Sequence, residues 1–541
     1  MSDGKMNLTN PSLFTHHSLL LIGDMMKMKT LLYSLFFIVL ILSPFACYEK
    51  KEATRPDIKI EIQPIGSVYI QYSDQSNSFR IGNELIERAV SVDKKSNRVY
   101  TSAFINKLSQ HNYVNSLSEE FSLRVNGTTV SGVTDNIEYV THNILSGVNL
   151  KGLELTFHVK LEGVGTFNLR LLYEIYSHIP AIRKWIEIEN PTGSSVTVDS
   201  IIPERLSLLP GLESDIEGHD LVEYSDNKNI GGLSPVIINT NLMEGFILGN
   251  EAPGVLKYYN IYSKPGQLAV GMKPINEPYA LEIPLGPGET FTSPATFIFF
   301  FNGDLVESKA MLSEFISGYV SLTEERSNSV WFENTSPETT ESQLADSISR
   351  AKGSGADVFC LDGNWTDKRG NWTYEKNTYI KNLSEQVHNA GMKFGLCVDV
   401  ALAEPDSIVF TQHPQWVVKS KNGSDYAVPD TKTKLMCMGS EYALYMAYEI
   451  DSLVKELNLD YIKLTGAMIP TADVGGCFAE GHLHRTSGES LWNIYDGLFG
   501  FITYLRGENP NLIVNVSLES YNPPGALDYA LLRYTDANWS L

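Results

Sequence analysis

Short apolar strands alternate with amphipathic helices through the second half of the 541-residue chain, and this alternation constrains the fold more than any other feature. Apolar runs typical of strands occupy residues 330–332, 357–361, 393–400, 460–464 and 512–518, and a sixth begins near 536–539. Helical spacing separates them, as in Leu344, Ile348 and Ala351, and one of the helices is expected to start at Ser440, a favourable N-cap residue. The pattern is typical of a parallel sheet and favours a barrel. Because a closed barrel has eight strands, we expect a (β/α)8-type TIM barrel over residues 323–541, truncated after about strand 6.

The first half of the chain has the two-residue period of antiparallel strands. Apolar and polar side chains alternate through residues 153–162, and again through 183–189, before the turn signal Asn190-Pro191. Helical periodicity is scarce before about residue 305. These features predict an N-terminal β-sandwich over residues 58–304, followed by a linker over 305–322 with a helix within 311–319. The predicted fold class is therefore multidomain, β plus α/β.

The first 47 residues have the pattern of an export signal. Lys27 and Lys29 precede an apolar run over residues 31–42, and the small residue Ala46 precedes Cys47. This is a signal peptide of the lipoprotein type, and its apolar run is shorter than the ~20 residues that a membrane span needs. We expect lipid attachment at Cys47 and a tether over residues 48–57. The protein would then be exported and anchored to the bacterial cell envelope, facing the periplasm or the surface.

Polar and aromatic residues recur where the expected parallel strands end. Active sites of such barrels lie at the carboxyl ends of the strands. Carboxylates and a lysine can hold sugar hydroxyls, and indole rings can stack on the face of a pyranose. The sequence therefore predicts a sugar site, and its candidate residues are Trp331, Glu333, Asp362, Trp365, Asp399, Lys463, Thr465, Glu519 and Trp539.

The cysteines and two histidines are the candidate metal ligands. Cys360, Cys397, Cys437 and Cys477 have irregular spacing without a CxxC pair, which favours buried free thiols over disulfides or metal ligands. The pair His482 and His484 could ligate a metal, but no third ligand stands at a suitable spacing, so a solvated loop is favoured. We expect no metal site.

An ordered set of motifs connects the second half of the chain with a known family. The motifs are residues 361–365 (LDGNW), 369–372 (RGNW), 388–396 (HNAGMKFGL), 413–416 (HPQW), 460–463 (DYIK), 519–520 (ES) and 539–540 (WS). They resemble those of the α-galactosidase (melibiase) group, glycoside hydrolase family 36-like. Residues 179–190 of the expected sandwich agree as well, so the resemblance covers roughly residues 60 to 541.

The resemblance implies a retaining glycosidase, which uses one carboxylate as nucleophile and a second carboxyl group as general acid/base. Thr465 stands at the position of the family's nucleophilic Asp, and Leu541 at that of its acid/base Asp. Both positions therefore lack a carboxylate; Asp473 and Glu519 are the candidates for a displaced substitute. The implied substrate contacts are Trp331, Asp362, Trp365, Asp399, Lys463, Glu519 and Trp539.

Three further departures bear on the substrate. Gly363, Tyr521 and Ala526 stand where the family carries residues that help to read galactose hydroxyls. The resemblance therefore implies an α-glycoside site without fixing its preference for galactose.

Three hypotheses follow. The chain hydrolyses terminal α-glycosidic bonds of oligo- or polysaccharides, or it is a catalytically inactive carbohydrate-binding relative, or it is a truncated gene product. The missing carboxylates favour the second or third.

The net charge of −22 and the absence of a basic stripe exclude nucleic acid as a partner. We expect no cofactor, a carbohydrate ligand, and contact with the membrane only through the lipid.

Overall fold

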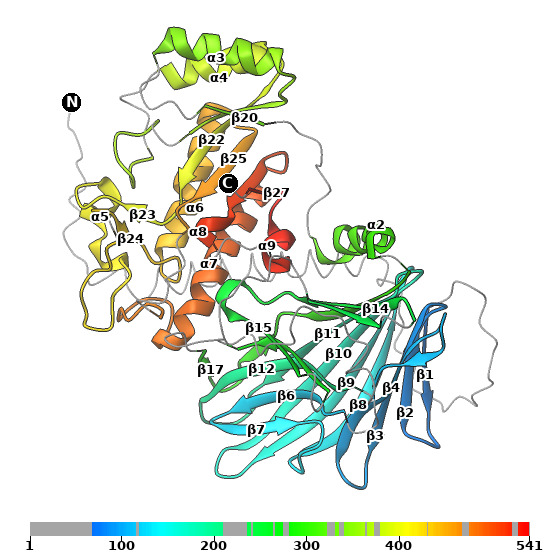
Figure 1. The fold of residues 1–541 in the computed structure, drawn as a ribbon. Coiled ribbons are helices and arrows are strands. Elements are labelled where there is room, and N and C mark those ends of the chain that lie inside the picture. The colour runs from blue at the N-terminus through cyan, green and yellow to red at the C-terminus, as the bar shows by residue number, and fades with distance from the viewer. Residues whose placement is uncertain are drawn as a thin grey trace, which may run out of the picture.

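The computed structural model describes residues 68–114, 118–208, 235–239, 242–262, 266–273, 281–303, 305–321, 331–334, 340–362, 365–372, 379–429, 431–467, 475–521 and 528–539. The expected leader, tether and lipid-bearing Cys47 lie outside these residues, as does Leu541. Figure 1 shows antiparallel sheets formed by the first part of the chain and a parallel sheet with helices formed by the second part. No helix within the described ranges is long and apolar enough to cross a membrane.

The described residues of the first part form three antiparallel sheets. One is a meander of β1 (Tyr69–Ser73), β2 (Ser78–Gly82), β3 (Ile86–Asp93), β4 (Arg98–Asn106) and β5 (His111–Asn112). The largest has the order β13 (Val236–Asn239), β14 (Glu244–Asn250), β19 (Thr296–Asn302), β11 (Ala181–Glu189), β10 (Gly165–Tyr176), β9 (Leu150–Leu161) and β8 (Ile137–Ser146), with β18 (Thr290–Thr292) on β11. The third has the order β15 (Lys257–Tyr262), β16 (Gln267–Met272), β12 (Val196–Ser207), β6 (Glu120–Val125) and β7 (Thr128–Ser131), with β17 (Ile283–Leu285) on β12 and the short η2 (Gly254–Leu256) before β15.

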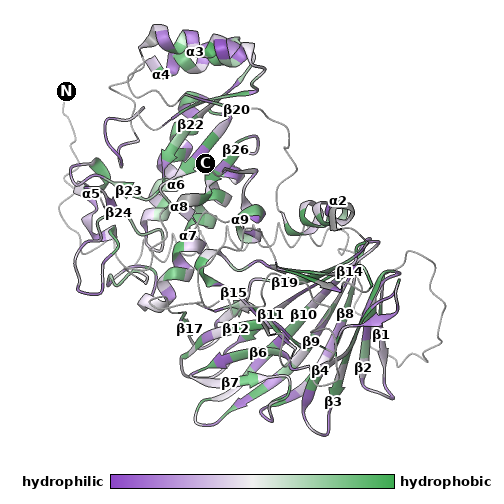
Figure 2. Ribbon diagram, viewed as in Figure 1, coloured by the Kyte–Doolittle hydropathy of each residue, from purple (hydrophilic) through white to green (hydrophobic). Residues whose placement is uncertain are grey.

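The period of two seen in the sequence places one face of each strand in the core. On β9, Leu153, Leu155, Phe157 and Val159 are buried. Apolar side chains from all three sheets join one buried cluster. In Figure 2 hydrophobic and hydrophilic stretches are mixed along the strands of the first part, as they are along α3 (Glu341–Gly353). The alternation therefore identified the buried face correctly.

A fully buried charged network crosses the sandwich core and joins its sheets. Arg88 on β3 contacts Glu120 on β6 at 2.6 Å and Glu204 on β12 at 2.7 Å. Lys184 on β11 lies 2.7 Å from the Glu120 carboxylate, and the Tyr173 hydroxyl donates to the same group at 2.7 Å. Because a buried ion is costly without partners, this network requires all of its members together.

In the second part, the residues that the structure describes form a parallel six-stranded sheet. Its order is β20 (Trp331–Asn334), β21 (Val358–Leu361), β22 (Lys393–Asp399), β25 (Tyr461–Thr465), β26 (Ile513–Ser517) and β27 (Ala537–Trp539). Helices separate the strands, and they are α3 (Glu341–Gly353), α4 (Tyr379–Asn389), α6 (Tyr442–Leu457), α7 (Ser487–Glu508), α8 (Leu518–Tyr521) and α9 (Tyr529–Tyr534). Between β22 and α6 lie β23 (Leu402–Ala403), α5 (Ile408–Gln412), η4 (Pro414–Trp416) and β24 (Lys434–Leu435).

Two helix boundaries differ from the sequence-based expectation. The helix expected at 311–319 is α2 (Leu305–Phe315), and a π-helical turn, η3 (Ile316–Val320), continues it. Helix α6 begins at Tyr442 after Glu441, not directly after Ser440. The Ser440 hydroxyl nevertheless accepts a hydrogen bond from the Tyr442 N–H at 3.2 Å, so it satisfies a donor at the helix start as its residue type predicted.

The sandwich contacts the helices of the second part through η2. The Gly254 N–H donates to Asp528 Oδ2 at 2.7 Å, and the Val255 N–H donates to the Tyr495 hydroxyl at 3.0 Å. Gly254 has a φ of +45°, and a Cβ there would lie 1.9 Å from the Tyr495 hydroxyl oxygen. Only glycine fits this close approach between η2 and α7.

Candidate functional site

Polar side chains from neighbouring strands meet at the carboxyl end of the parallel sheet. The register pairs Cys397 with Lys463, and Asp399 with Thr465, so these alternate residues of β22 and β25 share one face of the sheet. Lys463 Nζ donates to Glu333 Oε1 at 2.6 Å. This arrangement confirms that strands far apart in sequence bring charged groups to one place.

Lys463 is nearly buried beside two carboxylates and a thiol. Glu333, Asp362 and Cys397 each contribute a ligand-type atom within 4.8 Å of the others. Burial lowers the pKa of Lys463, but the hydrogen bond from Lys463 to Glu333 and the negative charge of Glu333 outweigh it, so the pKa is raised. The ammonium group is therefore positive at neutral pH, and a positive donor between carboxylates is suited to binding sugar hydroxyls.

Thr465 lies at the carboxyl end of β25, beside a carboxylate but without one of its own. Its hydroxyl lies 2.9 Å from Asp399 Oδ1 and 3.4 Å from the Val398 carbonyl oxygen. Arg369 Nε lies 3.0 Å from Asp399 Oδ2. The Asp399 carboxylate is thus already occupied by a hydroxyl and a guanidinium.

Cys397 cannot replace a carboxylate nucleophile here. Its Sγ lies 3.7 Å from the Thr465 hydroxyl oxygen. Burial and the negative charge of Asp362 raise the pKa of Cys397 to about 12. The sulfur is therefore a neutral thiol at neutral pH, and the thiolate is the nucleophilic form.

Two predicted tryptophans lie at the start of β20 and in the core, respectively. Trp331 is the first residue of β20 and pairs with Val358, and its ring lies 6.2 Å from that of Tyr461, the first residue of β25. It therefore lies toward the amino end of the sheet. Trp365 is 2 % exposed and donates from Nε1 to the Cys397 carbonyl at 2.6 Å. The ring therefore packs in the core against β22. A side chain so deeply buried offers no free face to a ligand.

Four predicted residues lie near or beyond the ends of the ranges that the structure describes. The backbone of Glu519 belongs to α8, and that of Trp539 to β27, where it pairs with Ser517. Asp473 and Leu541 lie outside the described residues. Their expected roles stay predictions.

The expectation for the cysteines is confirmed in part. Cys360, Cys397, Cys437 and Cys477 are buried, and none of these four forms a disulfide. The expectation of a solvated loop at His482 and His484 is wrong, because His484 is only 5 % exposed and both histidines lie against Cys437 and Cys477. The spacing of residues in the sequence did not predict this cluster, because Cys437 lies between β24 and α6, whereas the other three residues lie between β25 and α7. Arg369 was also missed, although its RGNW motif is visible in the sequence.

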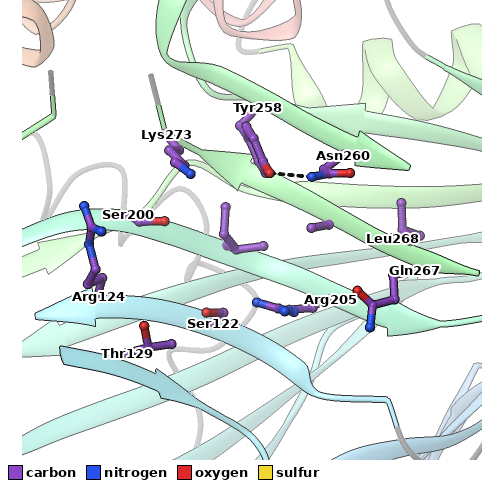
Figure 3. A pocket seen from close by; sticks show the side chains of 12 residues that line it. Ser122, Arg124, Thr129, Ser200, Arg205, Tyr258, Asn260, Gln267, Leu268 and Lys273 are labelled. Atoms are coloured by element: carbon purple, nitrogen blue, oxygen red, sulfur yellow. Dashed lines mark hydrogen bonds between the residues drawn. The ribbon is translucent and has the colours of Figure 1, made fainter. Parts of the chain in front are cut away.

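A hollow lies on the six-stranded antiparallel sheet, away from the residues described so far (Figure 3). Its volume is about 480 Å³, and its charged lining residues are Arg124, Arg205 and Lys273. None of the lining residues that the structure describes is a carboxylic acid. Hydrolysis by the retaining mechanism needs two carboxyl groups, so this hollow is not the candidate active site.

Comparisons with known proteins match the part of the chain that forms the parallel sheet. The Melibiase family model matches residues 326–541. The chain is 27 % identical over 213 residues to α-galactosidase 2 of Pediococcus pentosaceus, over 37 % of this chain and 28 % of that protein. It is 26 % identical over 273 residues to the bifunctional α-galactosidase/sucrose kinase AgaSK of Mediterraneibacter gnavus, over 47 % of this chain and 27 % of that protein. The matched stretch therefore spans less than a third of each relative.

Solved structures of similar fold cover both parts of the chain. The α-galactosidase AgaB from Geobacillus stearothermophilus, of glycoside hydrolase family 36, has a TM-score of 0.69 at 15 % identity, over 87 % of this chain and 75 % of that one. Variants of AgaA from the same organism, solved with raffinose and with stachyose, each have a TM-score of 0.67 at 14 % identity, over 86 % of this chain and 75 % of theirs. At such identity the likeness shows the fold, and it confirms the multidomain, β-rich architecture. Together with the family match, these findings show that the chain is similar to the α-galactosidase (melibiase) group, glycoside hydrolase family 36-like.

Proposed function

We propose that the carboxyl end of the parallel sheet binds the terminal α-galactosyl unit of an oligosaccharide, and that Thr465 makes hydrolysis there very slow. The observation that carries the proposal is the placement of Thr465 at the end of β25, hydrogen-bonded to Asp399 beside the pair of Lys463 and Glu333. The six strands are taken as part of a (β/α)8-type barrel, whose active sites lie at this end.

Sugar binding is supported by the groups that converge on this face. Lys463 is a charged donor, and Glu333 and Asp362 are acceptors that a ring hydroxyl can bridge. Hydrogen bonds to charged groups contribute about 1.5–3 kcal/mol each, more than those between neutral groups. The raffinose and stachyose bound by proteins of similar fold are ligands with a terminal galactosyl unit, which this proposal extends to the present chain.

Slow hydrolysis follows from the charge of the reacting side chain. A retaining glycosidase stabilises an oxocarbenium-like transition state with a carboxylate, which then bonds to the anomeric carbon. The Thr465 hydroxyl is neutral, and its nearest carboxylate, Asp399, is engaged by Arg369. Each ~1.4 kcal/mol added to the barrier slows the reaction tenfold, so losing the negative charge removes several orders of magnitude.

Saturation-transfer NMR with raffinose tests binding and stability of the ligand in one sample. We expect the strongest transfer to the protons of the galactosyl unit, competition by free galactose, and intact raffinose after prolonged incubation. Absence of transfer would overturn the proposed binding. Release of galactose would instead show an active enzyme, and Asp399→Asn would then show whether the neighbouring carboxylate acts in place of Thr465.

We also propose that the protein is exported and lipid-anchored at Cys47. The support is the sequence alone, with Lys27 and Lys29, an apolar run over 31–42, and Ala46 before the cysteine. In bacterial cells grown with a labelled fatty acid, we expect the wild-type protein to carry label in the membrane fraction and Cys47→Ser to carry none. Equal labelling of both proteins would contradict lipid attachment at this residue.

A further inference from the structure

Four side chains with metal-binding chemistry meet outside the proposed sugar site. Cys437, Cys477, His482 and His484 each offer one ligand atom, and these atoms all lie within 4.8 Å of one another. The two cysteines and His484 are buried, and His482 is partly buried. Two thiolates and two imidazoles form a ligand set that structural zinc sites use.

The spacing of the ligand atoms fits a tetrahedral ion. With Zn–N near 2.05 Å and Zn–S near 2.3 Å, tetrahedral geometry requires about 3.3–3.4 Å between two nitrogens and about 3.5–3.6 Å between nitrogen and sulfur. His482 Nδ1 lies 3.3 Å from His484 Nε2 and 3.5 Å from Cys477 Sγ. Cys437 Sγ lies 3.9 Å from His484 Nε2. Two of these separations match a zinc centre, and the third requires a shift of a few tenths of an ångström.

A second contact sets the protonation of His482. Its Nε2 lies 2.8 Å from the Gln415 carbonyl oxygen, which can only accept, so Nε2 carries the proton. In the neutral ring Nδ1 then presents a lone pair toward the cluster. A metal-bound histidine commonly donates its other N–H to a carbonyl in this way, which fixes both tautomer and ring orientation.

Backbone contacts hold the ligands from different parts of the chain in place. The Cys437 N–H donates to the Trp416 carbonyl at 2.8 Å, and the Leu483 N–H donates to the Gly439 carbonyl at 3.2 Å. The Cys477 N–H donates to the Ser490 hydroxyl on α7 at 2.7 Å. The ligand atoms are therefore brought together by the fold itself, which lowers the entropic cost of binding an ion.

We propose that Cys437, Cys477, His482 and His484 bind a zinc ion that fastens the segment between β22 and α6 to the segment between β25 and α7. The four protein ligands complete the coordination of the ion, so the site is structural and leaves no position for substrate. Both segments follow strands at the carboxyl end of the sheet, and the second one follows Thr465 directly. The ion would thus steady the surroundings of the sugar site without contacting sugar.

Metal content of the purified full chain tests this proposal independently of any sugar binding or hydrolysis. After reduction, removal of metal by a chelator and addition of zinc, we expect about one zinc ion per chain by elemental analysis. Cobalt in its place should give an intense visible spectrum of tetrahedral Co²⁺ and a sulfur charge-transfer band in the near ultraviolet. Chelation should lower the unfolding temperature, and zinc should restore it.

Matched variants separate this site from adventitious binding. Cys477→Ser and His482→Ala should lose the cobalt spectrum and most of the bound zinc, whereas Cys360→Ala, which removes a buried thiol outside the cluster, should keep both. A wild-type chain that stays metal-free after zinc addition would overturn the proposal, even where a variant fails to fold. A Cys437–Cys477 disulfide, detected by mass spectrometry of the unreduced protein, would overturn it as well.

Discussion

Replacing Thr465 with aspartate is expected to raise hydrolysis of an aryl α-galactoside by about 100- to 1000-fold, which corresponds to about 3–4 kcal/mol of barrier. The substitution places a carboxylate at the end of β25, where the family resemblance locates the nucleophile. Arg369, 3.0 Å from Asp399, offsets part of the repulsion between that carboxylate and the new one. The rate is measured as release of dinitrophenol from 2,4-dinitrophenyl α-galactoside.

The choice of substrate isolates the effect of one position. Dinitrophenolate leaves without protonation, so the result does not depend on the acid/base position at Leu541. Thr465→Asn is the matched control, because it has nearly the same shape as the aspartate variant but no charge, and we expect it to show no gain. Equal rates for the aspartate variant, the asparagine variant and the wild type would mean that the charge at position 465 does not limit the reaction.

The second large effect is expected in the sandwich, where Arg88→Met should lower the free energy of unfolding by about 3–5 kcal/mol. The substitution leaves Glu120 and Glu204 buried with Lys184 as their remaining cation in the network. Urea unfolding, followed by circular dichroism, measures the loss. Arg124→Met is the control, because the Arg124 side chain is 48 % exposed in its pair with Asp199 and such pairs contribute about 0–1 kcal/mol. Similar losses in the two variants would contradict a special role for the buried network.

The same network predicts the direction of acid sensitivity. Burial raises the pKa of Glu120, but the positive charges of Arg88 and Lys184 outweigh it and lower the pKa from 4.5 to about 2. A lowered pKa means that the carboxylate stabilises the fold fully above about pH 4.5 and loses this effect as the pH falls toward 2. Arg88→Met should therefore move acid unfolding to higher pH.

The fold was largely predictable because periodicity reports burial directly. The two-residue period of β9 and the helical spacing of Leu344, Ile348 and Ala351 on α3 identify side chains that are buried in the structure. Strand ends were predicted to within one or two residues. The start of α6 was predicted too early, at Ser440. This residue lies two positions before the helix, and its hydroxyl accepts a hydrogen bond from the Tyr442 N–H, as the side chain of a capping residue does.

The site was predictable only where neighbouring strands dictate contact. Lys463, Thr465 and Asp399 converge because parallel strands in register place their ends together. Burial of Trp365 could not be read from the sequence, because an indole serves equally well as a stacking platform or as part of a core. The grouping of Cys437 with His482 and His484 depends on two loops that meet only in the folded chain.

Calorimetric titration with methyl α-galactoside, on the wild type and Lys463→Met side by side, tests the central claim that this face binds sugar. Removing the ammonium deletes a charged donor, so affinity should fall by at least about tenfold, or ~1.4 kcal/mol. Lys455→Met is the control, because the Lys455 side chain is half exposed and pairs with Asp451 on α6. We predict that the wild type and the control bind the sugar with equal affinity and that Lys463→Met binds it at least about tenfold more weakly. The absence of heat from the wild type at millimolar sugar, or equal affinity of all three proteins, would contradict the account.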